Sequence, residues 1–201
     1  MDPRQPDLTR QSLLLAAFTE MHRQGFQAAS IANILADTGL TKGALYHHFP
    51  DKKALGLAVV DEVIAGYLAE NLFTPLRDAE RPVRALLDLI AGAQTNRTEE
   101  RIRLGCPLNN LMQEMSPVDE EFRAHLNTVL ARWQNSFESA LRASQQAGEV
   151  RPEVDCHSAA LFIVSAWEGC TGVAKNMQSP EAYRACMTQL HDYVGGLLTP
   201  E

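Results

Sequence analysis

The chain has 201 residues, enough for one domain of medium size or for a small domain and a larger one. Hydrophobic residues make up 45% of it, which favours a packed core and argues against disorder. The formal net charge of −7 excludes a chain that is basic throughout, but residues 1–55 hold six Lys and Arg against five Asp and Glu. Any attraction to phosphate must therefore come from local placement of cations near the N-terminus.

Residues 1–7 contain two prolines, and we expect them to form a loose arm. The apolar spacing that follows predicts a helix over residues 8–24, which Gly25 ends. Two short helices are then predicted over residues 30–39 and 41–48, with Ser30 and Thr41 as N-caps. Gly39 supplies the positive φ that the tight turn between them requires.

Two short helices joined by a tight turn form a helix-turn-helix, in which the second helix enters the major groove of DNA. Lys42 offers a cation to a guanine edge or a phosphate, and the small residues Gly43 and Ala44 permit close approach of the backbone. Other polar groups nearby can reach phosphate oxygens. The predicted DNA-binding residues are Ser30, Thr41, Lys42, Gly43, Ala44, Tyr46, His47 and Lys52. An ordinary helical hairpin in an all-α core is the alternative, although a small, cationic outer face is less expected there.

Residues 38–52 read TGLTKGALYHHFPDK, which closely resembles the signature of TetR-type transcriptional regulators. The match begins near Thr9 and covers roughly the first third of the chain. It departs mildly at Met21, where phenylalanine is usual, and at Leu35, where many helix-turn-helices carry alanine. The apolar residues that carry the earlier part of the match are Leu13, Leu14, Ala17, Phe18 and Phe26.

The remainder of the chain is also expected to be helical. A helix from Asp51 toward Phe73, ending before Pro75, is apolar on several sides and is a candidate lever between two parts of the protein. Further helices are predicted over residues 82–97, 107–115, 117–147 (with Ser116 as cap), 156–178 and 180–198. The predicted fold class is all-α, with a helix-turn-helix DNA-binding domain over residues 6–66 and an effector-binding and dimerisation domain over residues 67–201.

The resemblance implies that the second domain encloses a small-molecule pocket. Pockets combine an apolar lining with a few polar groups, and the chain supplies both. The predicted effector-binding residues are Cys106, Asn109, Asn110, Gln113, Trp133, Phe137, Phe162 and Trp167. Core packing is the alternative for each aromatic residue among them.

Cys106 begins a helix after Gly105, where the helix dipole favours a thiolate. Arg101 and Arg103 would add positive potential there. Some relatives with a similar Gly-Cys-x-x-x-Asn-Leu stretch sense electrophiles or oxidants through this cysteine, so the resemblance suggests such a sensor. A buried structural cysteine is the alternative.

The last two helices, within residues 156–198, are the expected homodimer contact. Residues 159–174 are nearly all apolar or small, and a periodic apolar stripe follows in the last helix: Tyr183, Cys186, Met187, Leu190, Val194 and Leu197. In the family two such helices from each chain form a four-helix bundle. The alternative is that they close the core of a single chain. A dimer predicts a near-palindromic operator in double-stranded DNA.

No signal peptide or membrane partner is expected, because the longest apolar run, Ala159–Val164, is too short to span a bilayer. The cysteines show no CxxC pairing, so reduced thiols in a cytoplasmic protein are expected. Neighbouring Cys156 and His157 would point apart on a helix and make a poor metal pair. We therefore expect no metal and no cofactor.

These observations predict a dimeric, sequence-specific DNA-binding regulator, a repressor released by a small molecule of unknown identity. A regulator without any ligand is the alternative within the same class. A helical enzyme is disfavoured, because no nucleophile elbow, Walker loop, HExxH motif or dinucleotide fingerprint occurs. A module that binds only other proteins would leave the surface from Lys42 to His47 without a purpose.

Overall fold

A computed structural model describes the backbone of residues 4–200 and the side chains of residues 8–200. The chain divides into two compact units. The first unit comprises the chain up to Gly66 together with Asn110–Val129, and the second comprises Tyr67–Asn109 together with the chain from Leu130 onward. The division predicted from the sequence did not anticipate that residues 110–129 group with the N-terminal helices.

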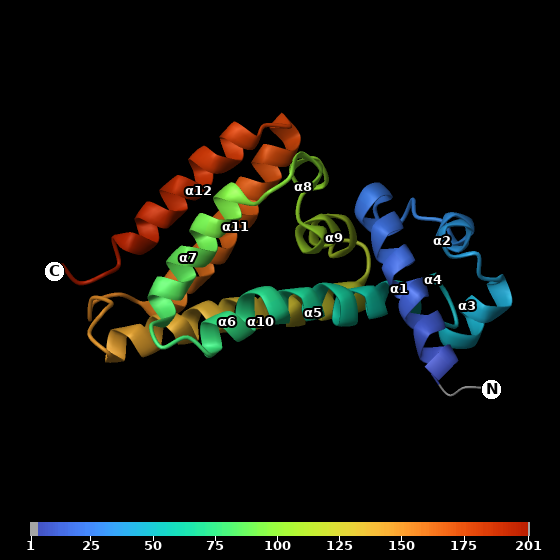
Figure 1. Ribbon diagram of the computed structural model, residues 1–201, viewed down its shortest axis with the longest axis horizontal. Coiled ribbons are helices and arrows are strands. Elements are labelled where there is room, and N and C mark those ends of the chain that lie inside the picture. Colours follow the sequence, from blue (N-terminus) through green and yellow to red (C-terminus); the bar gives the residue numbers. More distant parts are fainter. Residues whose placement is uncertain (1–3, 201) are drawn as a thin grey trace. The chain divides into compact units, whose positions relative to one another are not determined.

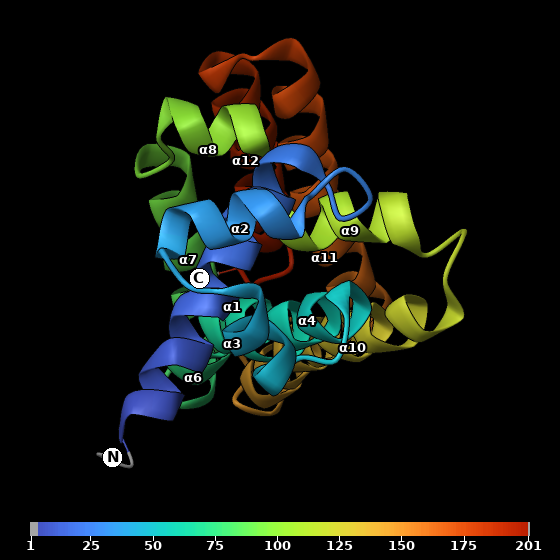
Figure 2. The same ribbon diagram turned by 90° about the vertical axis from the view of Figure 1, so that its right-hand side faces the viewer.

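The first unit contains α1 (Arg4–Gln24), α2 (Ile31–Thr38), α3 (Lys42–His48) and α4 (Lys52–Ala58), which group together in Figure 2. A loose arm over residues 1–7 is wrong for residues 4–7, because α1 begins at Arg4; residues 1–3 lie outside the described part. Each of the first four helices contributes apolar side chains to one core. Leu13, Ala17, Ile34, Leu45 and Leu55 are fully buried.

The helical run that starts with α4 continues as η1 (Val59–Ile64), α5 (Ala65–Leu68), η2 (Ala69–Phe73) and α6 (Thr74–Arg77). An end before Pro75 was expected, but the helix continues to Arg77. The Thr74 N–H donates to the Ala69 carbonyl, five residues back, in the wider π-helical pattern. Pro75 then stands in the first turn of α6, where its missing N–H costs little.

In the second unit, α7 (Pro82–Thr95), α11 (Cys156–Met177) and α12 (Pro180–Gly195) lie side by side (Figure 1). Helix α8 (Glu99–Leu104) packs against α11 and was not predicted from the sequence. The Thr98 hydroxyl caps it by accepting from the Arg101 N–H, and Gly105, with φ of 76°, ends it. At six residues α8 is too short to show a clear apolar period.

Helices α9 (Pro107–Met115) and α10 (Glu120–Gln146) each contribute residues to both units. The predicted cap Ser116 is wrong, because the Ser116 N–H continues the end of α9 by donating to the Met112 carbonyl. Asp119 is the cap of α10, since its carboxylate accepts from the backbone N–H groups of Glu121 and Phe122, both at 3.0 Å. The long helix therefore begins three residues later than expected.

The expectation of four reduced thiols is also wrong. Cys170 in α11 and Cys186 in α12 form a disulfide, with 5.5 Å between their Cα atoms. The helical hairpin of α11 and α12 brings together residues that are 16 positions apart in the sequence. Cys106, which is half-buried, and Cys156, which is buried, are free thiols.

Residues 4–200 form helices, turns and one isolated β-bridge between Val150 and Leu198, without a regular strand, so the predicted all-α fold class is confirmed. Within these residues no helix is both long enough and apolar enough to span a bilayer. They also contain no group of three or more His, Cys, Asp or Glu side chains arranged to hold a metal ion.

Candidate nucleic-acid interface

The geometry of the α2–α3 pair follows from three local capping interactions. The Ser30 hydroxyl accepts from the Asn33 N–H at 3.0 Å, and the Thr41 hydroxyl accepts from the Ala44 N–H at 3.2 Å. Between the helices, Gly39 has the left-handed φ of 66°. These contacts hold α3 in one orientation on the surface of the first unit.

Helix α3 has a buried side and an exposed side. Leu45 is fully buried and Phe49, just beyond the helix, is 3% exposed. Ala44 is half-buried. The exposed predicted residues are Thr41, Lys42, Gly43, Tyr46 and His47. The structure therefore brings small, cationic and hydrogen-bonding groups together on one accessible face, as groove recognition requires. Contact with DNA stays a prediction for each of them.

Two other residues predicted to touch DNA also have roles within the protein. Ser30 is half-buried and its hydroxyl is the cap of α2. The Lys52 ammonium donates to the Gln27 carbonyl at 3.0 Å and lies 4.9 Å from the centre of the Phe26 ring. Ser30 thus stabilises α2, and Lys52 stabilises the loop before it; contact with a phosphate oxygen stays a prediction for both.

The loop between α1 and α2 is held by a residue that sequence reasoning missed. The carboxylate of Glu114 in α9 accepts from the backbone N–H groups of Phe26 at 2.8 Å and Gln27 at 2.7 Å. Glu114 lies almost 90 residues away in sequence, and no local pattern connects it to this loop.

A second contact supports the same loop. The Phe26 ring packs against the Phe122 ring of α10 with 4.5 Å between the ring centres. A Cβ atom on Gly56 of α4 would come within 2.6 Å of the Phe26 ring and 2.8 Å of the Phe122 ring, so glycine is required there. The loop that precedes the helix-turn-helix is thus packed tightly by α4, α9 and α10.

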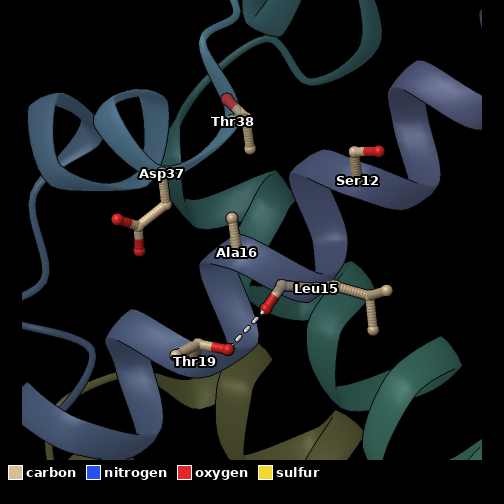
Figure 3. A pocket seen from close by; sticks show the side chains of 6 residues that line it. All are labelled: Ser12, Leu15, Ala16, Thr19, Asp37 and Thr38. Carbon is tan, nitrogen blue, oxygen red and sulfur yellow. Dashed lines mark hydrogen bonds between the residues drawn. The ribbon is translucent and has the colours of Figure 1, made fainter.

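A shallow groove lies between α1 and α2 (Figure 3) and is lined by Ser12, Leu15, Ala16, Thr19, Asp37 and Thr38. Its three hydroxyls donate to carbonyls of their own helices: Ser12 to Leu8, Thr19 to Leu15, and Thr38 to Leu35. Each of these hydroxyl groups therefore uses its proton in a hydrogen bond within its own helix.

In the second unit, three of the predicted effector-binding residues form one cluster. The rings of Trp133, Phe137 and Trp167 lie 6.1–6.3 Å apart, centre to centre, and all three residues are buried. The indole N–H of Trp133 is buried without an acceptor among the described residues. Phe162 does not join this cluster, because it is 50% exposed and its ring meets the Tyr193 ring edge to face, with 4.6 Å between the ring centres.

Cys106 lies beside the buried carboxyl group of Glu168. Loss of water around the thiol, followed by the effect of Glu168, raises the pKa of Cys106 well above its usual value. The expected thiolate is therefore wrong for this structure. Arg101 bonds the Tyr67 hydroxyl instead, and Arg103 pairs weakly with Glu100. An effector contact of Cys106 remains a prediction.

The polar residues predicted after Cys106 separate between the two units. The Asn109 side chain, in the second unit, donates to the Glu168 carbonyl at 3.4 Å. Asn110 and Gln113 belong to the first unit, where Gln113 is exposed. Their predicted effector contacts stay predictions.

Comparison with known proteins agrees with this architecture. Residues 13–59 match the model of bacterial regulatory proteins of the tetR family, and residues 82–190 match that of the tetracyclin repressor-like C-terminal domain. The transcriptional regulator AcuR of Cereibacter sphaeroides is 31% identical over 87% of this chain and 80% of that protein. The HTH-type transcriptional repressor DhaR of Mycobacterium sp. strain GP1 is 27% identical over 80% of this chain and 79% of that protein.

Solved structures give the same result. A TetR transcriptional regulator from Chloroflexus aurantiacus superposes with a TM-score of 0.85 at 26% identity, covering 97% of this chain and 98% of that chain. A TetR regulatory protein from Rhodobacter sphaeroides gives 0.82 at 28% identity, covering 92% and 98%. The chain therefore belongs to the TetR family of DNA-binding transcriptional regulators.

Proposed function

We propose that this regulator is a homodimeric repressor that binds a near-palindromic operator through α3 and leaves it when a small molecule occupies the second unit. The observation that carries the proposal is the exposed face of Lys42, Gly43, Tyr46 and His47 on a helix capped and oriented by its own sequence. Relatives such as DhaR are named as transcriptional repressors, which supports repression over activation. A regulator that binds the operator without responding to any ligand is the second candidate.

The dimer contact that we propose lies on α11 and α12, but not on the stripe expected from the sequence. The last-helix residues Tyr183, Met187, Leu190 and Val194 are buried within the chain, where they close its own core. The exposed apolar residues of α11 lie on another stripe: Leu161, Phe162, Val173 and Met177. Gly169 lies between them, and a Cβ atom there would meet nothing within 4 Å. An exposed apolar face of this kind favours a second copy as partner.

The DNA-binding proposal is tested by selecting bound fragments from a library of genomic duplexes with the purified protein. We expect one enriched sequence with approximate two-fold symmetry and half-sites about one helical turn apart or slightly more. Retention must also fall as salt is raised, because phosphate contacts release counterions. If the protein is folded but enriches no sequence from the library, the proposal is contradicted.

The dimer proposal is tested by the mass of the protein in solution. Val173→Glu places a charge on the exposed stripe and is expected to give monomers, because an unpaired charge in an apolar contact is costly. Val118→Glu is the matched control, since Val118 is 67% exposed in the first unit. A Val173→Glu protein that stays dimeric would show that the contact lies elsewhere.

A further inference from the structure

Glu168 is a charged side chain placed where charge is costly. It is 7% exposed, and its carboxylate oxygens have no hydrogen-bond donor among the described residues other than the weak S–H group of Cys106. The Cys106 thiol is close enough to act on the pKa of the carboxyl group, but an S–H group is a weak donor. A buried carboxylate without donors destabilises the fold, so its presence in α11 calls for a partner.

The nearest cation does not serve as that partner. The guanidinium of Arg97 acts on Glu168 through its charge, yet no hydrogen bond joins the two groups. Instead Arg97 stacks over the Tyr183 ring at 4.7 Å, and its Nη1 donates to the Tyr183 hydroxyl at 3.0 Å. Arg97 is thus held away from the carboxylate by Tyr183, which is itself 1% exposed.

The charged and titratable groups that face Glu168 are therefore Arg97, Cys106 and Tyr183. None of them offers the carboxylate a hydrogen bond of good geometry. The described residues also provide no cluster that would complete a metal site around it. An organic group with several N–H donors and a positive charge would supply the hydrogen bonds and the charge that these residues do not.

We propose that Glu168 anchors a binding site in the second unit for a small organic cation, a protonated amine whose ammonium group donates to the carboxylate oxygens. The same unit also holds the buried aromatic cluster of Trp133, Phe137 and Trp167, and aromatic ring faces attract cations. This inference rests on the proposed function, because it names the chemical class of the effector.

Protonation provides a signature of this mode of binding. Burial raises the pKa of Glu168 to about 7, so the carboxyl group is partly protonated at neutral pH. An ammonium group at the carboxylate stabilises the ionised form. Binding at pH 7 therefore releases about half a proton, and affinity rises between about pH 6 and pH 8.

The experiment is calorimetric titration of the full chain with three probes of one shape: benzylamine, benzyl alcohol and benzoate. We expect benzylamine alone to bind at millimolar concentration or below, with proton release measured in buffers of different ionisation enthalpy. Glu168→Gln keeps the shape of the side chain and is expected to weaken benzylamine at least about tenfold and to abolish proton release. Glu181→Gln, on the exposed part of α12, is the control and should bind as the wild type does.

Three results would overturn the proposal. These are tighter binding of benzoate with proton uptake, equal binding of benzylamine to the wild type and to Glu168→Gln, and no binding of benzylamine up to about 10 mM. The same preparations are titrated with operator DNA. If the wild type binds operator DNA but not the amine, the proposed ligand class is rejected and the proposed repressor function stands. If the wild type binds no operator DNA, the proposed function itself is rejected.

Discussion

The carboxylate of Glu114 bonds two consecutive backbone amides, those of Phe26 and Gln27, at the loop that precedes the helix-turn-helix. A Cβ atom on Gly25, which also has the left-handed φ of 84°, would stand 2.9 Å from this carboxylate. The absence of a side chain at Gly25 leaves room for the Glu114 carboxylate, which in turn fixes the loop that leads into α2. The residues after it in α9 and at the start of α10 belong to the same unit.

Removal of the Glu114 carboxylate should destabilise the first unit. Glu114→Ala leaves two amides without an acceptor, which should lower the free energy of unfolding by about 2 kcal/mol or more and weaken operator binding. Urea unfolding and an operator titration measure the two effects. Glu120→Ala is the control, because Glu120 is exposed and bonds only Arg123 among the described residues. If Glu114→Ala matches this control in both assays, the loop does not depend on Glu114.

Gly43 offers a test that separates DNA contact from folding. A Cβ atom at this position would meet only the Thr41 hydroxyl oxygen, at the ordinary distance of 3.8 Å. Gly43→Ala should therefore leave stability unchanged or slightly higher, since alanine favours helices. We expect operator affinity to fall about tenfold, because the added methyl group lies on the face that approaches the bases.

The matched control for this change is Gly66→Ala, where a Cβ atom would meet nothing within 4 Å. It should retain full operator affinity in the same fluorescence anisotropy assay. Equal affinity of Gly43→Ala and the wild type would mean that the N-terminal turn of α3 does not enter the groove closely.

Glu168 should make stability fall as pH rises. Burial raises the pKa of this carboxyl group from 4.5 to about 7, so the folded state binds more protons than the unfolded state between these values. The corresponding stability is fully present below about pH 4.5 and is lost as pH passes 7, by roughly 3 kcal/mol at most. Glu168→Gln should be more stable than the wild type near pH 8, with the difference vanishing toward pH 5. Parallel unfolding profiles of the two proteins from about pH 5 to 8 would contradict the burial argument.

The disulfide between Cys170 and Cys186 should stabilise the hairpin of α11 and α12. A cross-link over a loop of this length contributes about 3 kcal/mol, chiefly by restricting the unfolded chain. Dithiothreitol should lower the unfolding free energy of the wild type by that order and leave a Cys170→Ser, Cys186→Ser protein unchanged. A wild type that is insensitive to the reductant, with all four thiols titratable beforehand, would show that the bond does not form.

The local elements were the most predictable part of the fold. Ser30 and Thr41 both cap helices as predicted, because capping depends on residues only three positions apart. Errors arose where one local signal competed with another. Ser116 precedes a proline, as a cap often does, but Asp119 accepts two amide bonds and takes the role.

Side-chain partners far apart in sequence were not predictable. Glu114 with Phe26, and Cys170 with Cys186, depend on how helices meet, which no periodic pattern encodes. The apolar stripe of α12 was visible, but periodicity cannot tell a core-facing stripe from a dimer contact. Glu168 did leave a signal, as the one charged residue within the apolar run over residues 159–174.

The central claim is that α3 reads DNA, and one anisotropy titration tests it most directly. The operator obtained by selection is titrated with the wild type and with a Lys42→Ala, Tyr46→Phe double variant. A control variant, Arg101→Ala with Tyr67→Phe, removes a cation and a hydroxyl that contact each other in the second unit. We predict that only the α3 variant loses affinity for the operator, by about tenfold or more, and that its dimerisation and its free energy of unfolding stay unchanged. Equal affinity of all three proteins would contradict the assignment of α3 as the reading helix.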